Sequence, residues 1–139
     1  MARISSDYFL RSLALIAEVQ DGDMIKAIVF LAVVAANTGH LEQTGQGSRF
    51  AGVDSAPPDD VRRPVSALAI SQALGMPFET TRRYINRLIA DGVLARVKKG
   101  VIAPVAVVGS DEVSRVVATN ATNVRRFLRD LRRAGITLD

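Results

Sequence analysis

Residues 65–105 decide the fold, and they read VSALAISQALGMPFETTRRYINRLIADGVLARVKKGVIAPV. Ser66 belongs to the residue types that cap helices, so it predicts a first helix that ends at Leu74. Gly75 then supplies the positive φ that a sharp turn between two helices requires. Pro77 suits the first turn of a second helix, because its missing N–H has no helical partner there. The segment therefore predicts two helices joined by a tight turn.

The second helix, expected over residues 77–91, separates apolar from cationic side chains. Its apolar face follows three-to-four spacing and consists of Thr81, Ile85, Leu88 and Ile89, with Phe78 as a further candidate. The remaining positions hold Thr80, Arg82, Arg83, Asn86 and Arg87. A helix face that is rich in Arg and has no acidic residue in its middle is suited to contact phosphates.

A hairpin is expected directly after this helix. Two runs rich in β-branched residues, 94–97 and 101–105, flank Lys98, Lys99 and Gly100, which read as a tight turn. Two helices across a turn, followed by a hairpin, outline a winged helix-turn-helix over residues 65–106. In such a module the second helix enters the DNA major groove. The wing, here residues 94–105, lies on the DNA backbone or in the minor groove.

Residues 70–93 resemble the helix-turn-helix of GntR-type regulators, in which a small residue lies four positions before the turn glycine. In those regulators Thr-hydrophobic-Arg then precedes an apolar spine and a final glycine. The matching positions here are Ser71, Gly75, Thr80, Thr81, Arg82, Ile85, Leu88 and Gly92. The resemblance covers about 40 of the 139 residues. It implies that Thr80 and Arg82 reach base edges or phosphates, and that Lys98 and Lys99 touch the minor groove or backbone. Pro77 and Phe78 depart from the pattern, because those regulators often carry Ser or Thr and Arg there.

In overall plan the chain resembles MarR-type proteins, which place a central winged helix between terminal dimerising helices. Such a plan leaves room for a small-molecule effector between the terminal helices and the core, although no residue identifies one. The residues expected to bind DNA are Ser66, Thr80, Arg82, Arg83, Asn86, Arg87, Lys98 and Lys99.

Helices are also expected on both sides of this module. Ser6 and Asp7 predict a helix to about residue 20, and Asp23 caps a second helix to about residue 37, so that residues 6–37 form a helical hairpin. Residues 38–64 lack periodicity and contain seven Gly and Pro residues, which predicts a flexible loop. Ser110 predicts the start of a C-terminal helix over residues 110–134, with Gly135 just beyond its end.

The C-terminal helix carries a heptad-like seam of Val113, Val117, Asn120, Val124, Phe127 and Leu131. Two interpretations are open: the seam joins two copies of the chain, or it packs on its own domain. For the homodimer the expected interface residues are Tyr8, Phe9, Leu13, Asn120, Val124, Phe127 and Leu131. Asn120 would then pair across the two-fold axis and fix the register.

Composition narrows the classes of function. The chain has no Cys and a single His, His40, which argues against disulfides, thiolate catalysis and Cys- or His-based metal sites. It also lacks a phosphate-binding glycine loop and a nucleophile elbow, so we expect no enzyme, no cofactor and no metal. The N-terminus does not read as a signal peptide, and the apolar run 27–36 is about half of the roughly 20 residues that span a bilayer. A cytoplasmic protein without membrane contact is expected.

Positive charge is concentrated on the predicted DNA-binding module. Residues 62–99 hold eight Lys and Arg against two Asp and Glu, a net charge of +6, whereas residues 1–61 hold four against eight, a net charge of −4. We therefore expect a single domain, mainly α with a small β-hairpin wing, that acts as a dimeric transcriptional regulator on double-stranded DNA. The alternative is a winged-helix protein-protein interaction module that does not bind DNA.

Overall fold

Helices account for 74% of the computed structural model, which describes residues 1–43 and 57–137. In chain order the elements are α1 (Ala2–Glu18), a 3₁₀ turn η1 (Val19–Gly22), α2 (Met24–Gln43), a 3₁₀ turn η3 (Asp59–Val61), α3 (Ala67–Leu74), α4 (Phe78–Ala90), β1 (Ala95–Val97), β2 (Gly100–Ile102), α5 (Val105–Val108) and α6 (Asp111–Arg133). The strands pair antiparallel, with Arg96 opposite Val101. The expected class, mainly α with a small hairpin, is confirmed.

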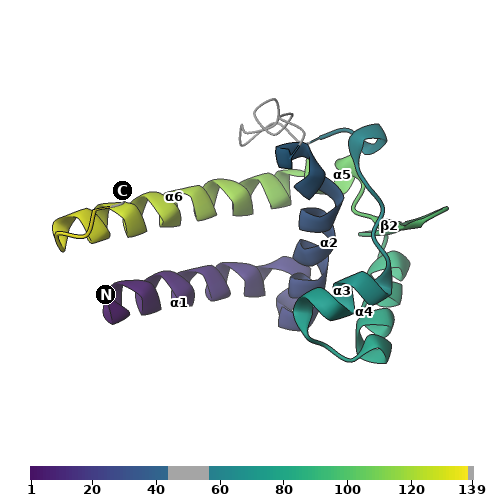
Figure 1. Cartoon of the computed structure of the whole chain (residues 1–139), viewed down its shortest axis with the longest axis horizontal. Helices are drawn as coiled ribbons and strands as arrows, with labels where there is room; N and C mark the ends of the chain where they lie inside the picture. Colours follow the sequence, from purple (N-terminus) through teal and green to yellow (C-terminus); the bar gives the residue numbers. More distant parts are fainter. Residues whose placement is uncertain (44–56, 138–139) are drawn as a thin grey trace.

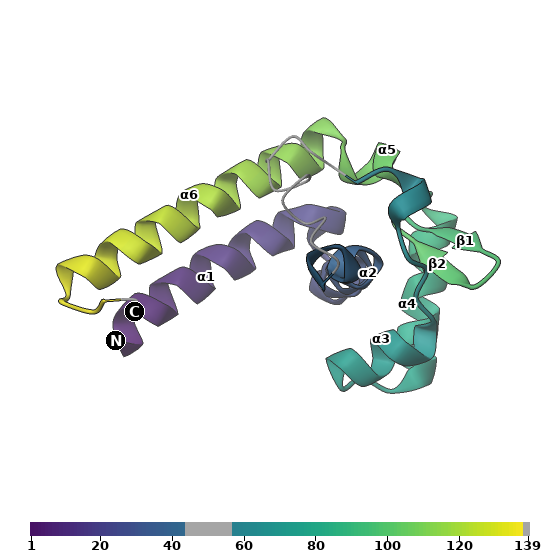
Figure 2. The same ribbon diagram turned by 45° about the horizontal axis from the view of Figure 1, so that its top comes forward.

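Two parts of the molecule are seen in Figure 1. Helices α1 and α6 lie side by side and point away from the rest of the chain, and we call this pair the arm. Helix α2 runs across the root of the arm, and α3, α4 and the hairpin lie on the other side of α2, as Figure 2 shows. We call α2–α5 the body.

The prediction that residues 6–37 form an N-terminal helical hairpin is wrong. Helix α1 begins at Ala2 rather than at residue 6, and its long partner is α6, whereas α2 runs across it. The stacked rings of Tyr8 and Phe127, whose centroids are 4.8 Å apart, hold the arm together. The chain changes direction at Gln20 and Asp21, which both have left-handed φ angles near 60° (60° and 56°). Asp23 caps α2 as expected, since its Oδ1 accepts from the backbone N–H of Lys26 at 3.1 Å.

Helix α2 supplies the centre of the core. Its window Met24–Leu41 is long and apolar enough to cross a membrane by length and composition, a longer stretch than the run 27–36 considered from the sequence. In the structure, apolar side chains of this helix pack in the protein core: Val29, Phe30 and Val33 are buried in the core cluster. The same cluster contains Ile70, Ile85, Leu88, Leu94, Val101 and Ala103. Helix α2 is thus the core helix on which α3, α4 and the hairpin pack.

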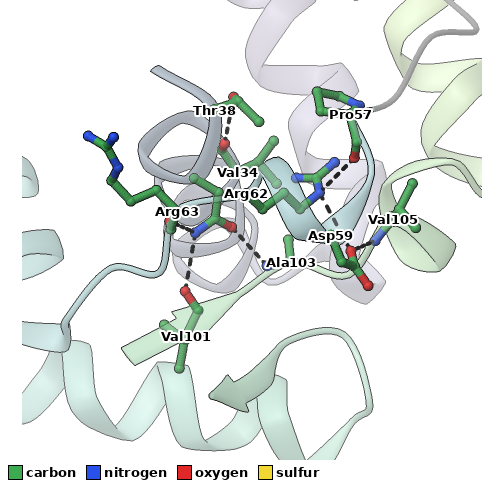
Figure 3. A network of polar contacts seen from close by, with 10 residues as sticks. Val34, Thr38, Pro57, Asp59, Arg62, Arg63, Val101, Ala103 and Val105 are labelled. Carbon is green, nitrogen blue, oxygen red and sulfur yellow. Dashed lines mark hydrogen bonds and ion pairs between the residues drawn. The ribbon is translucent and has the colours of Figure 1, made fainter. Parts of the chain in front are cut away.

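The side chain of Asn37 joins α2 to the segment before α3 and to the second strand, and Figure 3 labels its partners Arg63, Val101 and Ala103. Its Nδ2 donates to the carbonyls of Arg63, at 2.8 Å, and Val101, at 3.2 Å, and its Oδ1 accepts from the N–H of Ala103 at 2.9 Å. The backbone N–H of Arg63 also donates to the Asn37 carbonyl, at 2.8 Å. Asn37 is fully buried, and every donor and acceptor of its amide is used, as a buried polar group requires.

The prediction of a flexible loop over residues 38–64 is wrong at both ends of this range. Helix α2 continues to Gln43, and residues 57–64 pack on the body. Arg62 is buried there, with its Nε donating to the Pro57 carbonyl at 3.0 Å and lying 3.8 Å from Asp59 Oδ1. Burial lowers the pKa of the Arg62 guanidinium, and Asp59 opposes that shift. Residues 44–56 of the expected loop lie outside the described residues.

The predicted turn chemistry between α3 and α4 is confirmed. Ser66 Oγ accepts from the N–H of Ala69 at 3.1 Å, and Gly75 ends α3 with a φ of 64°. Pro77 precedes α4 as its N-cap, so the helix spans Phe78–Ala90 rather than residues 77–91. Ser110 caps α6 as expected, with its Oγ accepting from the N–H of Val113 at 3.4 Å.

The hairpin is shorter than expected and is joined by a third segment. Val65 and Val101 exchange two backbone hydrogen bonds, of 3.1 and 2.9 Å, so the segment before α3 lies beside β2. A Cβ on Gly100 would lie 2.4 Å from the Val65 carbonyl oxygen, so only glycine fits this approach. The second strand ends at Ile102, and residue 105, expected in the strand, begins α5 after Pro104, which has no N–H to continue a ladder.

Asn37→Ala is expected to lower the free energy of unfolding by about 2 kcal/mol or more, because it leaves the Arg63 carbonyl and the Ala103 N–H without partners, each at a cost of about 1–3 kcal/mol, while the Val101 carbonyl keeps its hydrogen bond from Val65. Urea unfolding followed by circular dichroism measures the change. Thr38→Ala is the matched control, since the Thr38 hydroxyl bonds only back to the Val34 carbonyl one turn earlier. Equal losses in the two variants would contradict the central role of Asn37.

Candidate nucleic-acid interface

Helix α4 is built from a buried spine and an exposed cationic face. Thr81, Ile85 and Leu88 are each at most 2% exposed, and Ile89 is half-buried. Phe78, the further candidate for this spine, is 43% exposed and does not belong to it. Because the spine packs in the core, the exposed side of α4 is the side that carries Arg82, Arg83 and Arg87.

Arg82 is paired with Glu79 one turn earlier. The Arg82 Nη2 donates to Glu79 Oε2 at 2.9 Å, and its Nε lies 3.2 and 3.3 Å from the two carboxylate oxygens. These hydrogen bonds, together with the charge of Arg82, lower the pKa of Glu79, and they raise the pKa of Arg82 in turn. Glu79 is therefore ionised at neutral pH. Its carboxylate binds Arg82, the Arg of α4 that lies nearest the start of the helix.

The other two cations of α4 are differently placed. Arg83 is exposed and forms no hydrogen bond or ion pair with another described residue. Arg87 is exposed too, and its guanidinium carbon lies 5.1 Å from the centre of the Tyr84 ring, a cation-π distance. Both therefore present their donor groups to solvent.

Asn86 connects α4 with the hairpin. Its Oδ1 accepts a hydrogen bond from Arg96 Nη2 on β1 at 3.0 Å. Arg96 is exposed and was not among the residues expected at the site, although an Arg in the first strand beside a cationic helix is a detectable signal. Contact between residues ten positions apart in two different elements could not be read from the spacing alone.

Lys98 and Lys99 are exposed and form the turn of the hairpin, as expected. Thr80 is half-buried on α4. Ser66 is exposed, but its hydroxyl oxygen already accepts the helix-capping hydrogen bond from Ala69. Of the eight residues expected at the site, Ser66 thus has an evident structural role, and the five cations are all exposed.

Helix α4 and the hairpin enclose a shallow cavity of about 360 Å³. Polar side chains of Arg82, Asn86 and Arg96 line it together with Phe78 and Gly100. The cavity brings Arg82 of the helix and Arg96 of the hairpin beside one another on one face. At the opposite end of α4, an ion pair between Lys26 and Asp91 fastens the helix to α2.

The residues expected at a dimer interface divide into two groups in the arm. Leu131 is buried within the chain, Phe127 stacks on Tyr8, and Val124 and Asn120 are half-buried. Tyr8 and Phe127 thus join α1 to α6, and Leu131 is buried within the chain, which is the intrachain packing that the seam left open as an alternative. Phe9 and Leu13 are 63% and 44% exposed, and Leu10 beside them is 66% exposed.

A second cavity, of about 450 Å³, lies where the arm joins the body. Residues of η1, α2, the end of α4, α5 and the start of α6 line it, among them Asp21, Lys26, Phe30 and Glu112. This is the region where the MarR-type plan leaves room for an effector, which stays a prediction.

Comparisons of the chain with protein-family models, with curated proteins and with solved structures found no match. The function of the cationic face is therefore argued from its own geometry and charge.

Glu79→Gln is expected to strengthen binding to DNA and to steepen its dependence on salt. The change removes a negative charge from the cationic face and releases Arg82 to contact a phosphate, so the slope of log K against log salt should grow by about 1. Fluorescence anisotropy with a random duplex over a range of salt concentrations measures both. Asp7→Asn is the matched control, because it removes one exposed negative charge from the arm, away from the cationic face. An equal gain from both variants would show that only net charge matters.

Proposed function

We propose that this protein is a DNA-binding transcriptional regulator in which α3, α4 and the β1–β2 hairpin act as a winged helix-turn-helix. Helix α4 enters the major groove, and the hairpin lies on the backbone or in the minor groove. The observation that carries the proposal is the cationic face: the exposed side of α4 and the hairpin beside it hold six cations, Arg82, Arg83, Arg87, Arg96, Lys98 and Lys99, against one carboxylate, Glu79.

A protein-interaction module with the same fold is the competing function. Such a module needs the buried spine but not a cationic face, and docking on protein favours an apolar patch. On α4 the exposed large apolar side chain is Phe78 alone, and it stands beside Arg82 and Arg96 at the same cavity. The charge of this face therefore supports a phosphate-rich partner.

The arm supports a homodimer. Within its two helices only Leu15 and Leu131 are buried, although α1 and α6 together contain 40 residues, 17 and 23 respectively. Two helices packed on each other have one covered side each, so an apolar side chain on the outer side stays largely exposed to solvent. Phe9, Leu10 and Leu13 are such side chains, and the same arm of a second copy would cover them and complete a four-helix arrangement. Dimerisation would place two copies of α4 about 34 Å apart on a roughly palindromic site.

DNA binding is expected to weaken steeply with salt on a random duplex, with log K falling by roughly 0.9 per phosphate contacted. Lys98→Ala combined with Lys99→Ala should weaken binding to all sequences alike and flatten this slope by about 1–2 units. Arg132→Ala combined with Arg133→Ala is the matched control, because it removes two adjacent exposed cations from the arm. A wild-type protein that does not bind duplex at low salt would refute the proposed function, and equal slopes in the wild type and the lysine variant would refute the role of the hairpin.

Phe9→Asp is expected to convert a dimer into a folded monomer, which sedimentation at micromolar concentration and circular dichroism together detect. The exposed ring of Phe9 contacts only the neighbouring Tyr8 ring on α1, with centroids 6.4 Å apart and a tilt of 55°, whereas Phe127 stacks on Tyr8 across the two helices, so its replacement would separate α1 from α6. Phe78→Asp, an equivalent change at an exposed ring of the body, should leave the mass unchanged. A wild-type protein that sediments as a monomer would disprove the dimer.

A further inference from the structure

We propose that Asn86 and Arg96 act together to read a guanine or a thymine in the major groove, and that Arg96 determines this preference by fixing the orientation of the Asn86 amide. The inference rests on the proposed DNA binding, and it adds to it the chemical class of base edge that is selected. Neither residue acts by charge alone in this scheme.

The orientation follows from hydrogen-bond chemistry. A guanidinium group only donates, so the atom of the Asn86 amide that lies 3.0 Å from Arg96 Nη2 has to be the oxygen. The amide nitrogen, with its two N–H groups, is then the end that remains, and it makes no hydrogen bond with another described residue. Arg96 thereby turns Asn86, which could both donate and accept, into a donor.

The pair also lies on the surface that would face the duplex in the proposed complex. Asn86 and Arg96 line the cavity between α4 and the hairpin together with Arg82 and Phe78, on the face that would meet the duplex. Each stands on a regular element, and β1 is held by β2, which Asn37 fastens to α2. A side chain that is fixed on a rigid element discriminates between bases better than one on a free loop.

Base edges differ in the groups that such a donor pair would meet. Adenine offers the acceptor N7 and the donor N6, and an Asn recognises it by using its oxygen and its nitrogen together. Here a cation already holds the oxygen, so the amino group of adenine, or that of cytosine, would face donors. Guanine offers only the acceptors N7 and O6, and thymine offers the acceptor O4. The pair therefore favours guanine or thymine.

The test is selection from a pool of random duplexes by the full-length protein, followed by sequencing of the bound fraction. Asn86→Ala identifies the position that this residue reads, because the preference there is lost. At that position we expect the wild type to favour guanine or thymine over adenine by about fivefold or more. In Arg96→Ala the amide is free to rotate, so adenine should rise to near parity while other positions of the site keep their preferences.

Arg83→Ala is the matched control, since it removes an exposed cation of α4 and should lower affinity for all sequences without changing any base preference. Thermal unfolding checks that all three variants stay folded. A wild-type preference for adenine or cytosine at the position lost in Asn86→Ala, no position lost in that variant, or an unchanged preference in Arg96→Ala would each overturn the inference while leaving DNA binding intact. A wild type that retains no duplex refutes the proposed function itself.

Discussion

The buried amide of Asn37 is the interaction on which the arrangement of the body depends. One side chain holds the segment before α3, through the Arg63 carbonyl, and the second strand with the residue that follows it, through Val101 and Ala103. Without this amide, α2 would offer the second strand only apolar contacts, which have no direction, and would hold the segment before α3 by the single backbone hydrogen bond from Arg63 to the Asn37 carbonyl. The hairpin would then lack a defined position relative to α4. The hydrogen bond between Arg96 and Asn86 requires that the hairpin has a defined position relative to α4.

The cationic face combines this fixed geometry with adjustable electrostatics. The apolar spine of α4 holds the helix in the core, and Arg83 and Arg87 make no hydrogen bond with another described residue. Glu79 is the exception among its neighbours, because it engages Arg82 and lowers the net charge next to the cavity. One acidic residue on such a face weakens binding to every sequence, and that leaves a larger share of the affinity to groups that distinguish bases.

The arm shows how packing inside one chain and assembly between chains compete for the same side chains. Tyr8, Phe127 and Leu131 were expected to join two copies; within the chain the rings of Tyr8 and Phe127 stack between α1 and α6, and Leu131 is buried. A helix of this length has more apolar side chains than one neighbour can cover. The residues that are left, with Phe9 and Leu10 the most exposed of them, form the outer side of the arm. The proposed dimer therefore uses a different face of α1 from the seam that periodicity indicated on α6.

Local chemistry was readable from the sequence, because its causes lie within a few residues of each other. The caps at Ser66 and Ser110, the left-handed glycine at Gly75, the spine of α4 and the Lys98–Lys99 turn all follow from such short-range rules. The helical extension of α2, the packed segment 57–64, the pairing of α1 with α6 and the contact of Arg96 with Asn86 did not follow. Each of these depends on groups that are far apart in the chain, and only the tertiary structure decides which of them meet. The sequence by itself thus determined the helices, their caps and the charge of α4, whereas the tertiary structure decided which surfaces stay exposed to bind a partner.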